Sequence, residues 1–381
     1  MSIWRRLGLA ALLLVLVFGV FVWRRLQDPP PGPQGEVVEA GEDRYNASII
    51  ASAVDLIEGD QKPGEVRHRD VHAKAHGCVK ATVATLDVEK HLRFGLFAEK
   101  KVYKAWIRFS SGDTRLQADK VRDARGFALK VMGVPGEKLL EEEKNEQTQD
   151  FVMINSRVFF VRTLGDYAEF MRAMGDGNRY GWFFGGPSPN PLRWRIRELR
   201  LALQTLKAAP RSPLDPQYHS LSAFALGPDL FVKWSARPCE GWTGKGGSKS
   251  GDDFLRAAMK ADLQSGEGCF DLLAQPQVAG KNMPVEDNTT LWPEADSPFV
   301  KVARITIPKQ DFDTPRQNAF CEALSFTTWH ALPAHRPAGA MNRLRKSVYQ
   351  QISLYRHGKS GMPRAEPRGW CLDLSGQACP E

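Results

Sequence analysis

Residues 121–131 read VRDARGFALKV, a stretch that changes within a few positions from charged side chains to an apolar pattern. The charged half suits a polar turn. The residues after Gly126, from 127 to 134, have the composition of a β-strand. This turn-to-strand transition predicts a sheet, and similar stretches lie on both sides of it.

Other strands are predicted upstream and downstream of this stretch. Residues 79–86 alternate between apolar and polar side chains, and residues 102–109 are rich in β-branched and aromatic ones. Further strands are expected at 158–161, 230–234 and 299–307, and helices at 166–174, 192–208, 253–263 and 338–355. Because the strands come first and the helices do not alternate with them, the order predicts an α+β fold with an antiparallel sheet or barrel.

The N-terminus contains an apolar run at 7–23, LGLAALLLVLVFGVFVW, with two arginines on either side. Its length is at the short end of the range for a membrane span, and no small-residue cleavage site follows it. We expect an uncleaved single-pass anchor over residues 1–27, with a cleaved signal peptide as the alternative. A Pro-rich linker, 28–36, then leads to one folded domain over 37–381.

The composition is that of a globular protein, with 42% apolar and 25% charged residues. The net charge of +8 is spread among acidic residues without a long basic run, so we expect no nucleic-acid partner. The six cysteines include no CxxC pair, which argues against a zinc ribbon. Disulfides and buried thiols both remain open, and Cys371 and Cys379 are near enough in sequence to pair.

Three histidines, His68, His72 and His76, are spaced four residues apart. On a helix they would share one face and suit a metal ion. The segment turns directly into strand alternation, however, and Lys74 and Gly77 fit a helix face poorly. We therefore expect a connector with histidines, not a helical metal site.

Residues 343–357, RLRKSVYQQISLYRH, have apolar side chains at helical spacing. Arg345 and Tyr349 lie four positions apart, so they project from the same side of the helix. A guanidinium beside a phenol favours the phenolate, which is a hard ligand for ferric iron. A surface Arg–Tyr pair without any ligand role is the plainer alternative.

Taken together, these stretches resemble the catalase family. The resemblance rests on RDVHAK at 69–74, RFS at 108–110, VRDARGFA at 121–128, DFVMINSRVFFVR at 150–162, and the arginine–tyrosine helix, which occur in the family's order. Residues 283–308 and 327–349 are similar to the smaller bacterial branch of catalase-related haem proteins, which includes relatives of allene oxide synthase. Ala124 stands where the family has proline.

The resemblance implies an antiparallel β-barrel with a b-type haem buried between the barrel and helices, and no bound NADPH. It implies that His72 is the distal acid/base and that Ser110 holds it in place. Tyr349 would be the proximal ligand and thus the metal ligand, with Arg345 stabilising its phenolate.

Further positions follow from the same resemblance. The haem propionates are expected to pair with Arg69, Arg108 and Arg356, and Phe159 is expected to line the distal pocket or its approach, together with Phe160. These residues complete the set expected to bind the cofactor.

The sequence departs from the family at the distal amide. The family commonly has two adjacent asparagines, of which the first is the distal one; here Ile154 takes that place and Asn155 the second. Either the local backbone is shifted by one residue and Asn155 supplies the distal amide, or the distal amide is absent and turnover of hydrogen peroxide is slow. Val71 is the catalase-like residue where the allene oxide synthase branch has threonine.

The function expected from the resemblance is a haem-dependent, peroxide-consuming oxidoreductase of catalase or peroxidase type. A fatty-acid hydroperoxide isomerase or dehydratase and a non-catalytic haem-binding protein are the alternatives. We expect a single-pass protein of a bacterial inner membrane with its domain on the periplasmic side. The peroxide, either hydrogen peroxide or a lipid hydroperoxide, stays open, as does assembly into a homo-oligomer.

Overall fold

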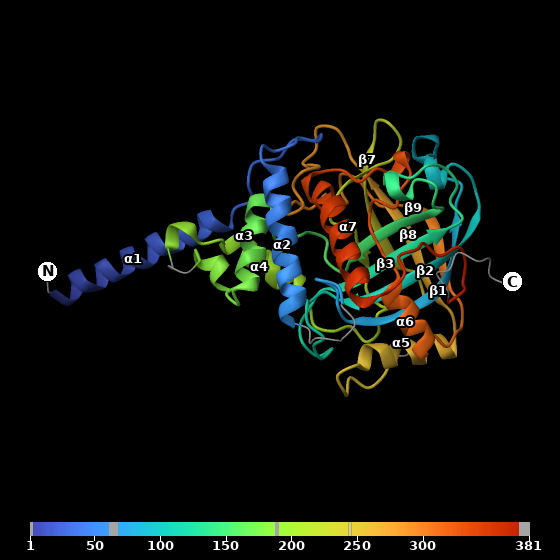
Figure 1. Ribbon diagram of the computed structural model, residues 1–381. Coiled ribbons are helices and arrows are strands. Elements are labelled where there is room, and N and C mark those ends of the chain that lie inside the picture. The colour runs from blue at the N-terminus through green and yellow to red at the C-terminus, as the bar shows by residue number, and fades with distance from the viewer. Residues whose placement is uncertain (1–2, 61–67, 187–189, 243, 245, 373–381) are drawn as a thin grey trace.

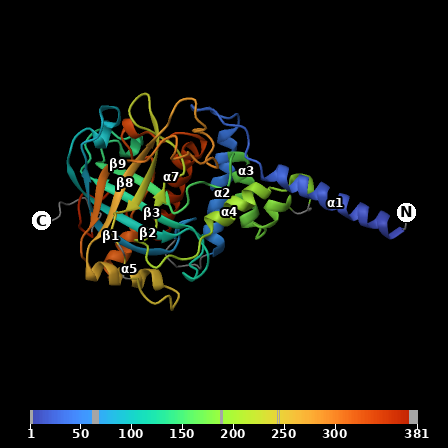
Figure 2. The ribbon, with the colours of Figure 1, turned by 180° about the vertical axis from the view of Figure 1, so that it is seen from behind.

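The computed structural model describes residues 3–60, 68–186, 190–242, 244 and 246–372, and its centre is a closed antiparallel β-barrel (Figures 1 and 2). Around the barrel the strand order is β5-β4-β3-β2-β1-β9-β8-β7; pairing of β5 with β7 closes the ring, and β6 pairs with β7. The strands are β1 (Ala75–Thr85), β2 (Val102–Ser111), β3 (Arg125–Met132), β4 (Thr148–Ile154), β5 (Tyr218–His219), β6 (Phe224–Ala225), β7 (Phe231–Pro238), β8 (Gly268–Pro276) and β9 (Val300–Ile307). The predicted α+β fold with an antiparallel barrel is confirmed.

Apolar and aromatic side chains fill the barrel interior. The ring of Phe127 packs against Phe109 at 5.3 Å, Tyr218 at 5.2 Å and Phe270 at 5.3 Å between ring centroids. All four side chains are buried and belong to the main core cluster. Because these side chains fill the centre, the barrel is a packed core and not a channel, and a ligand has to bind outside it.

The helices lie outside the barrel. They are α1 (Ile3–Leu26), α2 (Glu42–Asp60), α3 (Leu164–Gly175), α4 (Ile196–Thr205), α5 (Phe254–Ser265), α6 (Pro315–Ala323) and α7 (Ala340–Ser360). The long α7 runs beside the barrel, and α2 and α3 pack against it (Figure 1). In α7, Leu344, Val348 and Ile352 are spaced four residues apart and form one apolar core with α2 and α3.

Helix α1 projects away from the folded domain (Figure 2). Among the described helices it is the one long and apolar enough to cross a membrane. The Pro-rich linker that follows lies against the domain: the Gln34 side chain donates to the Lys281 carbonyl oxygen, and Glu36 pairs with Arg336. The linker therefore fixes the end of α1 to the domain and does not act as a free spacer.

Two disulfides cross-link distant parts of the domain. Cys78 of β1 is bonded to Cys321 of α6, and Cys239 is bonded to Cys269 of β8. Cys371 is disulfide-bonded as well, whereas Cys379, its expected partner, lies outside the described residues. Every cysteine in the described part of the chain is therefore oxidised, which decides the alternative that the sequence left open.

Most predicted elements are present with small shifts of their ends. The strand expected at 158–161 is wrong, because these residues form bends instead. The helix expected from Leu192 begins at Ile196, after a separate 3-10 turn. Helices α2 and α6 and strands β4, β5, β6 and β8 were not predicted. The segment from His68 to Lys74 is not helical, as expected.

Candidate active site

Two adjoining cavities lie between the barrel and α7. Both are lined by Asp70, Val71, His72 and Tyr349, and their empty volumes are about 880 and 1660 Å³, open solvent at their mouths included. The first cavity extends over β2, β3 and β4 of the barrel, and the second extends towards α3. Together they offer room for a cofactor-sized ligand.

The segment that precedes β1 carries His72 into the cavities with an unusual backbone. His72 has a φ of 59° and Leu221 a φ of 64°, and these are the two non-glycine residues with positive φ in the described part of the chain. Both line the larger cavity. Such conformations cost on the order of 1–3 kcal/mol each and tend to occur at functional sites. The His72 conformation is held because its N–H donates to Gly112 and its carbonyl accepts from Arg108.

Two barrel strands position the His72 ring. Its Nδ1 lies 3.0 Å from the hydroxyl oxygen of Ser110 on β2. Gly126 of β3 pairs with Ser110 across the strands, and the ring packs over this glycine. A β-carbon at position 126 would lie 2.6 Å from His72 Nδ1, so only glycine leaves room for the imidazole.

The imidazole of His72 is neutral at physiological pH. Burial, which is the largest cause, and the positive charges of Arg108 and Arg345 together lower the pKa of His72 to about 3. Burial also raises the pKa of the neighbouring Asp70 carboxyl to about 6, against the opposing effect of backbone hydrogen bonds. The cavity therefore contains a neutral base next to a carboxyl that titrates near neutrality.

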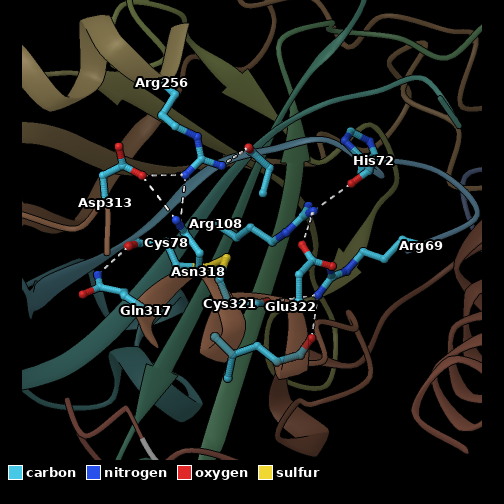
Figure 3. The surroundings of a disulfide bond; sticks show 12 residues. Arg69, His72, Cys78, Arg108, Arg256, Asp313, Gln317, Asn318, Cys321 and Glu322 are labelled. Carbon is cyan, nitrogen blue, oxygen red and sulfur yellow. Dashed lines mark hydrogen bonds and ion pairs between the residues drawn. A yellow bond between two sulfur atoms is a disulfide. The ribbon is translucent and has the colours of Figure 1, made fainter. Parts of the chain in front are cut away.

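Three arginines, Arg69, Arg108 and Arg356, line the first cavity and lie near Glu322. Figure 3 shows Arg69 and Arg108 on either side of the Glu322 carboxylate. Arg69 contacts Glu322 at 3.2 Å, and Arg108 approaches the same carboxylate at 3.7 Å. Arg356 of α7 donates to the Glu322 backbone carbonyl at 2.5 Å, and both Arg69 and Arg356 donate to the Leu324 carbonyl. The cluster therefore has three guanidiniums around the one carboxylate of Glu322, and the Asp70 carboxyl interacts with two of them, Arg69 and Arg356.

The charged groups of this cluster shift one another's pKa values. Burial and the charge of Arg69 together lower the pKa of Arg108 and of Arg356 to about 9, against the opposing effect of Glu322. Burial raises the pKa of Glu322, but the positive charges around it outweigh burial, and the net pKa is well below its usual range. Within the described residues, the buried Nε of Arg108 has no hydrogen-bond partner. The cluster is therefore suited to an anion that enters from the cavity.

Helix α7 supplies the wall that faces the barrel. Tyr349 is half-buried and lines both cavities, and Arg345, one turn earlier, lines the larger one. The Arg345 guanidinium donates to Asn342 at 3.1 Å and to Ser222 at 3.4 Å. Arg345 and Tyr349 thus share a face of α7 that borders a cavity, as their spacing predicted.

The larger cavity is mostly apolar beyond His72. Phe159 and Phe160 line it, with their ring centroids 4.8 Å apart, and Ile154 lies beside them in the lining. Asn155 does not line either cavity: its side-chain oxygen accepts from the Arg125 backbone N–H at 2.7 Å. The structure thus brings together the other predicted site residues but turns Asn155 away, and an isoleucine occupies the place expected for the distal amide.

Two residues of the site were missed from the sequence. Glu322 belongs to no motif, although a carboxylate at the C-terminal end of a helix is unfavourable for the helix dipole and could have suggested a special role. Gly126 lies in the VRDARGFA motif and at the end of a polar turn, but neither pattern gave it a role in the site. Its role depends on β2–β3 pairing, which the sequence pattern does not give.

A family model described as catalase matches residues 55–179. Catalase A of Pseudomonas putida is 24% identical over 277 residues, which cover 67% of this chain and 56% of that protein. A catalase of Helicobacter pylori is 29% identical over 156 residues, 40% of this chain and 27% of that protein. The chain spans about half, or less, of the length of these curated relatives.

Solved structures show the same fold. The crystal structure of a fungal catalase aligns with a TM-score of 0.59 at 17% identity, covering 79% of this chain and 62% of that chain. Catalase A from Saccharomyces cerevisiae aligns with a TM-score of 0.58 at 19% identity, covering 79% and 64%. The stretch that matches the family model, residues 55–179, includes His72, Ser110 and Gly126. The structural similarity covers 79% of the chain and so extends well beyond this stretch. The chain is therefore similar to catalases in the sequence of residues 55–179 and shares the fold of solved catalases.

Proposed function

We propose that this protein binds a b-type haem between the barrel and α7, with Tyr349 as the iron ligand, and consumes a peroxide. The observation that carries the proposal is that both adjoining cavities are lined by the same two residues. A neutral His72 lines them from the barrel side, and Tyr349 lines them from α7. A base and a phenol on two walls of one cavity are the groups that this chemistry needs.

The residues present fit haem. A b-type haem has two propionates, and the three guanidiniums of Arg69, Arg108 and Arg356 line the cavity around the single carboxylate of Glu322. Charge-assisted hydrogen bonds from guanidiniums are the usual way to hold such carboxylates. The bound haem iron supplies the redox chemistry by which the O–O bond of the peroxide is cleaved.

His72 is proposed to move the proton. A neutral imidazole accepts a proton from the peroxide oxygen that remains and returns it to the departing oxygen, which leaves as water or an alcohol. The hydrogen bond between Nδ1 and Ser110 and the contact with Gly126 fix the ring for this transfer. Tyr349 is proposed to bind as the phenolate, with Arg345 one turn earlier on the same side of α7.

A second candidate substrate is an organic hydroperoxide with a long apolar chain. The lining of the larger cavity favours it: Ile154 replaces the expected amide, and Phe159, Phe160, Phe170 and Met174 extend the apolar surface. An apolar cavity without that amide positions hydrogen peroxide poorly but holds a hydrocarbon chain well. Hydrogen peroxide remains the first candidate because His72 and its supports are intact.

The proposed location is a bacterial inner membrane, with α1 as the single span and the domain in the periplasm. The length and composition of α1 support the span. The oxidised cysteines support the periplasmic side, because structural disulfides form and persist in oxidising compartments.

The test is peroxide consumption by the purified full chain supplied with haem, together with its His72→Ala and His91→Ala variants. His91 is an exposed histidine away from the cavities, so His91→Ala is the matched control. We expect His72→Ala to lose about 100-fold or more in turnover, the usual contribution of a general acid–base. Haem-loaded wild type that consumes neither hydrogen peroxide nor an organic hydroperoxide contradicts the proposal.

A further inference from the structure

The surface where α1 leaves the domain carries exposed apolar side chains. Phe184, the last residue of the 3-10 helix η4 (Gly181–Phe184), is 40% exposed, and Leu192, in the 3-10 helix η5 (Pro191–Arg193), is 72% exposed. Figure 1 shows that this part of the domain, next to α3 and α4, is the end from which α1 projects. Large apolar side chains gathered at one place on a surface point to a binding partner.

Side-chain contacts fix this surface to the end of α1. The ring of Trp194 packs edge-on against Phe21 of α1 at 6.1 Å and against Phe184 at 5.7 Å. The Arg25 guanidinium donates to the Leu192 backbone carbonyl and lies 5.5 Å from the centre of the Phe21 ring. The exposed apolar residues therefore lie at the level of residues 21–25 of α1.

These α1 residues are at the boundary of the predicted span. The apolar run ends at Trp23, and Arg24 and Arg25 follow it. Tryptophan and arginine at the end of a span lie at the level of the lipid headgroups. With a rise of about 1.5 Å per residue, Phe21 lies roughly 6 Å deeper than Arg25. A segment that contacts both residues lies between the headgroups and the acyl chains.

Basic side chains border the same surface. Arg193 is exposed next to Leu192, and Arg200 is exposed on α4, 3.9 Å from the Asp28 carboxylate just after α1. Guanidiniums pair well with phosphates, so these arginines suit phospholipid headgroups. Aromatic and leucine side chains next to arginines are the composition of an element that lies in the membrane interface.

We propose that Phe184, Leu192, Arg193 and Trp194, here called the interfacial surface, insert into the headgroup region of the bilayer that α1 crosses. The inference rests on the proposed anchoring by α1 but not on haem. It has a consequence for the active site: Phe183, the neighbour of Phe184 in η4, is buried and lines the larger cavity. One short helix then separates the cavity from lipid.

The test uses the full chain in nanodiscs of phosphatidylethanolamine and phosphatidylglycerol. A nitroxide spin label is attached to Leu192→Cys, and to Val102→Cys as the control. Val102 is 66% exposed at the start of β2, on the barrel. We expect the label at 192 to collide with dissolved oxygen more than with a water-soluble nickel complex, and the label at 102 to show the reverse. Equal access of the nickel complex to both labels overturns the proposal.

A second measurement does not depend on an added cysteine. Tryptophan emission of the wild type and of Trp194→Phe is compared in nanodiscs with and without brominated lipids. We expect the emission lost on Trp194→Phe substitution to be quenched by brominated lipid; if that component is unquenched, the proposal fails. Neither measurement requires haem or peroxide, so failure of the proposed enzymatic function leaves both tests valid.

Discussion

The Nδ1 atom of His72 lies 3.0 Å from the hydroxyl oxygen of Ser110, and both atoms pack against the backbone of Gly126. Ser110 and Gly126 are paired residues of β2 and β3. A β-carbon at position 126 would lie 2.5 Å from the Ser110 oxygen and 2.6 Å from Nδ1. The orientation of the His72 imidazole therefore depends on position 126 of β3 being a glycine.

Gly126→Ala should displace the His72 ring from its hydrogen bond. We expect peroxide turnover to fall by about 100-fold through misplacement of the base, and unfolding free energy to fall by about 1–3 kcal/mol through overpacking. Steady-state rates and thermal unfolding measure both effects. Gly266→Ala is the control, because nothing lies within 4 Å of its added β-carbon and its backbone is extended. Unchanged turnover of Gly126→Ala would show that this glycine does not set the ring's position.

The sequence predicted the long barrel strands and α7 because their side chains alternate or recur in patterns that burial imposes. Residues 79–86 and 102–109 became β1 and β2, and the spacing of Arg345 and Tyr349 became a cavity-facing side of α7. Strand β4 was missed because Thr148, Gln149 and Asp150 at its start are polar yet buried. Asp150 forms an ion pair there with the buried Lys130 of the neighbouring strand β3. The two residues are brought together by the fold and are 20 positions apart in the sequence.

The site was predicted where motifs carried it and missed where it depends on distant contacts. His72 and Ser110 come from separate motifs, and their strands bring them together. Glu322 reaches the arginines because a disulfide and packing hold α6 against β1. The sequence left open whether Asn155 supplies the distal amide or the amide is absent; the Asn155 side chain accepts from the backbone of Arg125, and Ile154 lines the cavity. Which of two adjacent residues on a strand end faces a cavity is decided by register, which the local sequence did not specify.

Ile154→Asn should raise the turnover of hydrogen peroxide. The side chain of Ile154 lines the cavity near the position where an amide is expected to orient the peroxide. We expect an increase of about 3- to 10-fold, the size of one added hydrogen bond in the transition state. Ile154→Val, which keeps the site apolar, is the control. A decrease for hydrogen peroxide with an unchanged rate for an organic hydroperoxide would argue against that placement of the amide.

Removing the Cys78–Cys321 disulfide should weaken haem retention more than removing the Cys239–Cys269 disulfide. Either double alanine variant loses about 2–5 kcal/mol of unfolding free energy. The first variant also frees α6, which holds Glu322 against the arginines (Figure 3). Transfer of haem to apomyoglobin measures retention. We expect haem transfer to be about tenfold faster for the first variant than for the second, equivalent to about 1.4 kcal/mol. Equal transfer rates in the two variants would show that the Cys78–Cys321 disulfide does not support haem binding.

Turnover should be independent of pH near neutrality once the Asp70 carboxyl is removed. The pKa of His72 is lowered to about 3 by burial, so the imidazole stays neutral above about pH 5. Its ordinary pKa in an unfolded chain is about 6.5, so protonation favours the unfolded state and this residue lowers stability as pH falls below that value. In an Asp70→Asn variant, which removes the cavity carboxyl whose pKa burial raises to about 6, a pH–rate profile from about pH 5 to 8 is therefore flat. A rise in rate centred near pH 6.5 would mean that His72 titrates as a solvent-exposed histidine.

The central claim is haem ligation by Tyr349, and the optical spectrum of the haem-loaded full chain tests it most directly. Wild type is compared with Tyr349→Phe and with Tyr355→Phe, a tyrosine of the same helix that lines neither cavity. We predict a high-spin ferric spectrum with tyrosinate features in the wild type and in Tyr355→Phe, and its loss or change in Tyr349→Phe. A haem spectrum that is identical in all three proteins, or a wild type that takes up no haem, contradicts the account.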